Sequence, residues 1–151
     1  MTTSTDPHDL NRFVEAQRDS YAQALAELRA GRKRSHWMWF VFPQLAGLGS
    51  SVMARRYAIR DRNEARAYLD HPFLGARLRA CAEALLAIEG RSAREILGSP
   101  DDLKLGSSAT LFAQISPPGS VFHRLLERYY DGQPDPLTLE RLSAESGHDE
   151  R

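Results

Sequence analysis

Residues that begin and end helices recur along nearly the whole of this 151-residue chain. Ser92 and Glu95 have the spacing of a capping box, in which each side chain hydrogen-bonds the backbone N–H of the other residue. Ser120 precedes an apolar run with helical spacing, and Asp131-Gly132 follows that run as a stop. No segment alternates apolar and polar residues for long enough to predict a surface strand. The sequence therefore predicts an all-α fold.

The clearest helical pattern follows His71-Pro72, where apolar residues recur at intervals of four and three positions. Cys81 occupies one of these core positions, so we expect it to be an inert small hydrophobic residue. Gly90 ends the pattern. Asp6-Pro7 predicts the start of a first helix, and Arg29 with the stop at Gly31 predicts its end. Similar signals predict further helices over Asp61–Leu69, Ser99–Phe112 and Ser120–Tyr129, and a last short turn over Leu137–Leu142.

The apolar run Trp37–Phe42 is too short for its periodicity to distinguish a helix from a strand. A lone strand would have no partner for its backbone hydrogen bonds, so we interpret the run as buried extended or irregular chain crossing a helical core. The expected fold is a compact, single-domain multihelical bundle with a buried irregular Trp-rich segment. Residues 6–142 form the domain, between a flexible N-terminus (1–5) and a disordered polar tail (143–151).

Composition narrows the classes of partner. Twenty basic residues balance 20 acidic ones, which argues against nucleic acid and membrane surfaces as partners. The longest apolar run is far too short to span a bilayer, and the polar N-terminus has no signal-peptide pattern. The chain has one cysteine and no pair of histidines four positions apart, so we predict neither a metal site nor a cofactor. A cytoplasmic location is expected, with a homodimer left open.

The zero net charge hides an asymmetry between the two halves of the chain. Residues 1–80 carry a net charge of +5 and residues 81–151 a net charge of −5. The basic excess lies in two arginine-rich clusters, at 29–34 and at 55–66. Such clusters are typical of solvated helix faces and helix C-termini, but they could also form a positively charged wall for an anionic ligand.

The first candidate site is the segment 36–51, which contains both tryptophans of the chain and ends in Gly47-Leu48-Gly49-Ser50-Ser51. The indoles could wall a pocket by stacking, or they could fill the core with their N–H groups satisfied. The glycines and serines could cradle an anion with help from an arginine one turn later, or simply form a turn and a helix cap. The candidate ligand-binding residues here are Trp37, Trp39, Gln44, Gly47, Gly49, Ser50, Ser51 and Arg55.

The second candidate site is the segment 100–112, which contains Lys104, one of only two lysines in the chain. On a helix, Asp101, Lys104 and Ser108 share one face. Lys104 and Asp102 are the candidates for acid–base catalysis, and Ser108 is a candidate ligand contact. The alternative is an exposed ion pair of little energetic value.

Four motifs in this order resemble the bacterial domain-of-unknown-function 1810 family: HWMWFVFPQLAGLGSS (36–51), Tyr57-Ala58-Ile59, DHPFLGARL (70–78) and PDDLKLGSSATLF (100–112). The resemblance covers roughly Asp6 to Leu142 and implies a compact multihelical fold. Members are sometimes labelled calpastatin-like, but nothing in these residues supports protease inhibition. The resemblance implies no reaction.

The leading hypothesis from the sequence is binding, with turnover left open, of an anionic small molecule such as a nucleotide or sugar phosphate. The alternative is a non-catalytic protein-interaction module that uses the Trp-rich patch and the oppositely charged halves. The first hypothesis requires that Trp37, the Gly49–Ser51 stretch and Lys104 line one cavity.

Overall fold

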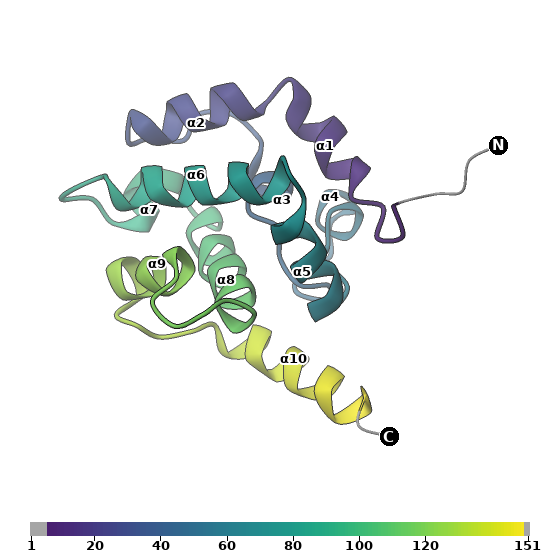
Figure 1. Ribbon diagram of the computed structural model, residues 1–151. Coiled ribbons are helices and arrows are strands. Elements are labelled where there is room, and N and C mark those ends of the chain that lie inside the picture. Colours follow the sequence, from purple (N-terminus) through teal and green to yellow (C-terminus); the bar gives the residue numbers. More distant parts are fainter. Residues whose placement is uncertain (1–5, 150–151) are drawn as a thin grey trace.

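The computed structural model describes residues 6–149, and the chain folds there into ten helices joined by loops (Figure 1). An isolated parallel bridge between Leu45 and Ile59 is the nearest approach to a sheet in this part of the chain. The predicted all-α fold is therefore confirmed. The helices are α1 (Asn11–Arg18), α2 (Tyr21–Arg29), α3 (Met38–Val41), α4 (Val52–Arg56), α5 (Arg62–Asp70), α6 (Leu74–Leu86), α7 (Ala93–Leu97), α8 (Asp101–Gln114), α9 (Val121–Tyr130) and α10 (Pro136–Asp149).

Helix α6 lies in the middle of the molecule and packs against α2, α5 and α9. Figure 1 shows α1 and α2 above it and α8 and α9 below it, with α10 lowest in the view and running outward to the C-terminus. The buried ring of Tyr68 joins these layers, because it contacts Phe13 of α1 and Phe112 of α8 at centroid distances of 5.0 and 5.5 Å. One continuous apolar core therefore connects the two halves of the chain.

Several of the predicted capping residues begin helices as expected. Ser92 and Glu95 form a complete capping box at α7, and the side chain of Ser120 accepts the His123 N–H at the start of α9. Asp61 caps α5 in the same way, through the Glu64 N–H. Because these bonds satisfy backbone groups within a few residues, local sequence was enough to predict them.

Helix boundaries at both ends of the chain differ from the prediction. The first helix begins at Asn11 rather than Pro7, and it is broken near Asp19, which lets α1 pack against α3 while α2 packs against α6. At the other end of the chain, α10 continues to Asp149, through residues 143–149 for which the sequence predicts a disordered tail. Residues 1–5 and 150–151, also predicted to be disordered, lie outside the described residues.

The Trp-rich segment is buried as predicted, but it contains one helical turn, α3, rather than only extended or irregular chain. Its position is set by the carboxylate of Glu27, near the end of α2. This carboxylate accepts hydrogen bonds from the Trp37 indole at 2.8 Å and from the backbone N–H groups of Arg34 and Ser35 at 2.7 and 3.0 Å. The Ser35 hydroxyl adds a fourth bond, at 2.6 Å. Glu27 thus folds the chain after α2 back onto the core.

Glu27→Gln should lower the free energy of unfolding by about 2–3 kcal/mol at pH 7, because the amide cannot accept the same set of bonds. Burial alone would raise the pKa of Glu27, but the bonds from Ser35, Arg34 and Trp37 outweigh it and lower the pKa to about 2. The stabilisation is therefore complete above pH 4.5, and it is lost as the pH falls toward 2.

Denaturant unfolding at several pH values should show the gap between wild type and Glu27→Gln closing over this acid range. Glu15→Gln is the matched control, because Glu15 lies in an exposed ion pair with Arg18. An equal loss in both variants, or a gap independent of pH, would contradict the assigned role of Glu27.

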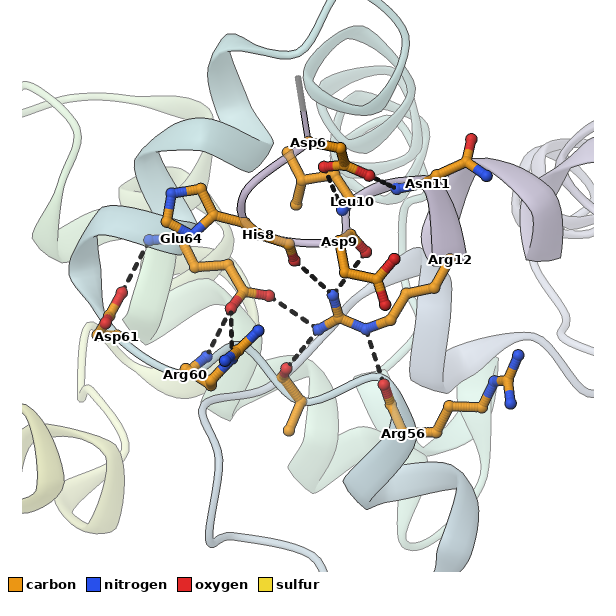
Figure 2. Close-up of polar contacts among 11 residues, drawn as sticks. Asp6, His8, Asp9, Leu10, Asn11, Arg12, Arg56, Arg60, Asp61 and Glu64 are labelled. Atoms are coloured by element: carbon orange, nitrogen blue, oxygen red, sulfur yellow. Dashed lines mark hydrogen bonds and ion pairs between the residues drawn. The ribbon is translucent and has the colours of Figure 1, made fainter. Parts of the chain in front are cut away.

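A second buried carboxylate, Glu64 of α5, is held by Arg12 of α1 (Figure 2). All five N–H groups of the Arg12 guanidinium have acceptors at 2.7–2.8 Å: the Glu64 carboxylate and the carbonyls of His8, Asp9, Arg56 and Ala58. Arg12 therefore joins α1 to α5 and fixes the chain just after α4.

Arg12→Ala should destabilise the fold by about 3–5 kcal/mol, because it leaves the fully buried Glu64 carboxylate without its main countercharge. Arg18→Ala, which breaks an exposed pair on the same helix, should cost no more than about 1 kcal/mol. Thermal and denaturant unfolding measure both variants. If both variants lost a similarly small free energy of unfolding, Arg12 would not hold α1 and α5 together as proposed.

Candidate functional site

A cavity of about 710 Å³ lies where the chain before α4, the first half of α8 and the loop from α9 to α10 meet. The first of these segments contributes Gln44, Leu48, Gly49, Ser50 and Ser51, and α4 itself adds Ala54. Pro100, Leu103, Lys104, Gly106 and Ser107 come from α8 and the residue before it. The third wall runs from Tyr130 to Leu137. Segments that lie far apart in the sequence therefore share one hollow.

The Gly49–Ser51 lip of this cavity is held by hydrogen bonds on both sides. The Ile59 N–H donates to the Gln44 carbonyl at 2.8 Å, and the Ala46 N–H donates to the Ile59 carbonyl at 2.7 Å. These two backbone bonds close the loop around α4. Arg141 of α10 donates to the Ala46 carbonyl at 2.8 Å, and its guanidinium fills the space that a Cβ at Gly47 would need. Gly47 therefore serves the loop, and it does not line the cavity.

Lys104 lies on α8 and lines the cavity, where it contacts both a carboxylate and an aromatic ring. Its ammonium lies 3.4 Å from Asp101, whose other oxygen lies 3.0 Å from Lys33. Lys104 also sits 5.0 Å from the ring centroid of Trp39, and Lys33 sits 5.3 Å from that of Trp37. Both lysines of the chain thus share one carboxylate and rest on its two tryptophans. This arrangement orients Lys104 and leaves N–H groups for a ligand.

The sequence gives both indoles as candidate ligand contacts, but neither of them lines the cavity. Trp37 is 1% exposed, because its N–H is satisfied by Glu27 inside the core. Trp39 is half-buried and reaches the cavity only through Lys104. The tryptophans therefore fill the core and support Lys104, and stacking on a ligand is left to other residues.

Three other candidate residues also lie away from the cavity. Arg55 lines a separate pocket beyond α4. Asp102 does not join Lys104, because residues two apart on a helix face different directions. Ser108 shares the face of Lys104 but lies one turn deeper, in the core. The Ser108 hydroxyl and one Asp102 oxygen are buried without a hydrogen-bond partner. The predicted acid–base pair is therefore not assembled.

The wall formed by the loop from α9 to α10 was missed by sequence reasoning. Tyr130 lies against Gly106, where an added Cβ would come within 3.2 Å of the ring, and its hydroxyl donates to the Asp102 carbonyl. Burial raises the pKa of Tyr130, so the phenol stays protonated. The run Pro134-Asp135-Pro136 indicates a turn in the sequence, but nothing local places that turn beside Lys104.

The cavity combines apolar walls with few unpaired polar groups. Asp135 is already engaged as the cap of α10, since its carboxylate accepts from Ser107 at 3.2 Å and from the hydroxyl and N–H of Thr138 at 2.6 and 3.0 Å. Gln44 is half-buried, and its side-chain amide forms no hydrogen bond with any described residue. The Gln44 amide and the Lys104 ammonium are therefore available to a ligand, as are the side chains of Ser50, Asp131 and Gln133 in the same lining.

Residues 6–149 contain no group of three or more His, Cys, Asp or Glu side chains that could hold a metal ion. No helix in this part of the chain is both long and apolar enough to cross a membrane. The single cysteine, Cys81, is buried in α6, and burial raises the pKa of its thiol to about 12. Cys81 thus has the environment of a core residue.

The fold and this cavity define a compact, all-α protein with a cavity that has both polar and apolar walls. The family model described as Protein of unknown function (DUF1810) matches residues 7–142, so the chain belongs to this family. The chain is also 54% identical to the conserved hypothetical protein Rv1873 from Mycobacterium tuberculosis, whose crystal structure superposes with a TM-score of 0.90. This match covers 91% of the present chain and 99% of the other. No curated protein matches.

Gly49→Ala should destabilise the cavity lip by about 1–3 kcal/mol, because an added Cβ would lie only 2.7 Å from the Cβ of Ala54. Removing that second Cβ in Gly49→Ala/Ala54→Gly should recover the part of the loss due to the clash. Ala54→Gly alone should cost about 1 kcal/mol through helix propensity. Urea unfolding of the four proteins measures the coupling, and strictly additive losses would contradict this packing.

Proposed function

We propose that this protein binds an uncharged small molecule in the cavity between α4, α8 and the loop from α9 to α10. The observation that carries the proposal is the meeting of Gln44, Ser50 and Lys104 around one hollow of about 710 Å³. Ligand pockets of globular proteins are typically about 300–1,000 Å³, with mostly apolar walls and a few oriented polar groups. Both properties are present here.

The charges around the cavity favour an uncharged ligand over the anionic one that the sequence predicts. Lys104 is the one cation among the lining residues, whereas Asp131 and Asp135 contribute two carboxylates to the same lining. The ammonium also shares Asp101 with Lys33. A phosphate here would therefore meet more negative than positive charge.

The apolar walls suit a ligand with a flat or hydrocarbon face. Leu48, Pro100 and Pro134 line the hollow, with the Tyr130 ring beside them. Gln44 can both donate and accept hydrogen bonds, while Lys104 can only donate. A nucleoside or glycoside without its phosphate has this combination of a ring face and several hydroxyl or carbonyl groups.

An interaction module remains a second candidate because large apolar side chains are exposed at the cavity mouth. Leu103 and Leu137 line the cavity with exposed fractions of 66% and 58%, and Val52, next to Ser51, is 72% exposed. Exposed apolar residues of this size mark protein contacts when they lie close together. Light scattering over a range of concentrations separates self-association through this patch from ligand binding by a monomer.

Melting curves with paired compounds should test the proposal: nucleosides against their nucleotides, and sugars against their phosphates. A neutral compound that binds should stabilise the protein by about 2.7 kcal/mol at 100 times its dissociation constant. Its phosphorylated partner should stabilise the protein less. Gln44→Ala and Lys104→Met should each reduce the shift, because each removes a polar group that is available to a ligand.

Gln114→Ala is the matched control, because Gln114 is exposed at the end of α8 and lies outside the cavity. It should leave the ligand-induced shift unchanged. Equal shifts in all the variants, or no shift with any neutral compound, would refute binding at this cavity.

A further inference from the structure

A second hollow, of about 400 Å³, lies on the other side of α4, and four arginines line it: Arg12, Arg55, Arg56 and Arg60. Asp9 is the one acidic residue in its lining. Figure 2 shows the inner part of this region, with Arg12 surrounded by its acceptors and Arg60 beside Glu64. Three arginines of the basic cluster that the sequence places at 55–66 thus border a concave surface together with Arg12 of α1.

The four arginines have unequal roles. Arg12 has no N–H group left, since all five are used within the fold. Arg56 uses its Nε toward the Tyr57 hydroxyl at 3.3 Å, and Arg60 uses its Nε toward Glu64 at 3.4 Å. Their terminal nitrogens are not used in these contacts. Arg55 is exposed and forms no side-chain hydrogen bond or ion pair with any described residue.

The usual explanation for arginines at the end of a helix does not account for this cluster. Cations are favoured at a helix C-terminus because of its unpaired carbonyl groups. After α4, however, the carbonyls of Arg56 and Ala58 are already bonded to Arg12 at 2.8 and 2.7 Å. These carbonyls are therefore not partners of Arg55, Arg56 and Arg60, which border the hollow.

The charges can be counted from the contacts. Four guanidinium groups face two carboxylates, the lining residue Asp9 and the buried Glu64, which pairs with Arg12 and Arg60. The difference among these groups is +2, which favours an oxyanion as the ligand. Arginine is well suited to this class of ligand, because its planar group binds phosphate oxygens through two parallel N–H bonds.

We propose that this arginine-lined hollow is a binding site for a phosphate monoester, held by Arg55, Arg56 and Arg60. Arg12 acts as a positioning residue, since it fixes the chain that carries the other three and contacts no ligand itself. The site is separate from the cavity proposed above: the two hollows share no lining residue and lie on opposite sides of α4.

Titration with glycerol phosphate at constant ionic strength, followed by NMR of the arginine Nε–H signals, tests the site. Signals from Arg55, Arg56 and Arg60 should shift, and those of Arg12 should change least. Arg55→Ala and Arg60→Ala should each raise the dissociation constant about tenfold or more, the usual effect of losing a hydrogen bond to a charged group. Arg55→Ala should not change the melting temperature, because Arg55 has no partner in the fold.

Arg66→Ala is the matched control, because Arg66 is exposed on α5 and does not line the hollow. The proposal is overturned if this variant weakens binding as much as Arg55→Ala, or if chloride at the same ionic strength produces the same shifts. Binding to phosphatidic acid vesicles without competition from glycerol phosphate would also overturn it. Gln44→Ala should leave phosphate binding unchanged, so failure of one site is distinguishable from failure of the other.

Discussion

A buried carboxylate is tolerated only where hydrogen bonds and countercharge replace its water, and the rest of this structure depends on how that requirement is met. Glu27 takes its donors from the chain after α2 and from Trp37. Glu64 takes them from Arg12, which also bonds the carbonyls of Arg56 and Ala58. The two carboxylates therefore fix both ends of the segment that carries the Trp-rich run and α4. That segment has little regular structure of its own, since α3 and α4 span four and five residues.

This fixed segment separates two hollows of opposite character. On one side, Gly49, Ser50 and Ser51 face Lys104 and the loop from α9 to α10. On the other side, Arg55 and Arg56 face the start of α1. The anion-binding constellation predicted from the sequence is thus divided: its serines border a cavity with more acidic than basic residues, and its arginine borders a basic pocket. The family match and the similarity to Rv1873 agree with the fold and leave the ligand as a proposal.

Much of the helical framework could be predicted because helix caps and stops act over a few residues. The capping box of Ser92 and Glu95 and the apolar stripe of α6 are present as expected. The sequence could not show whether the Gly49–Ser51 stretch and Lys104 line the same cavity, because they are more than fifty positions apart in the chain. The residues from Tyr130 to Leu137 form the third wall of the cavity, and no pattern in their own sequence indicates that they line a cavity. Its place depends on how α9 packs against α8.

The sequence by itself determined the all-α class, most helix limits and the burial of Cys81, because propensity, capping and apolar spacing are properties of neighbouring residues. The tertiary structure alone decided which polar residues face a ligand. In the sequence, Glu27 and Arg12 look like ordinary charges on helix surfaces, and Trp37 looks like a residue that could wall a pocket. Long-range hydrogen bonds place all three inside the fold, and these bonds depend on distances that no local pattern records.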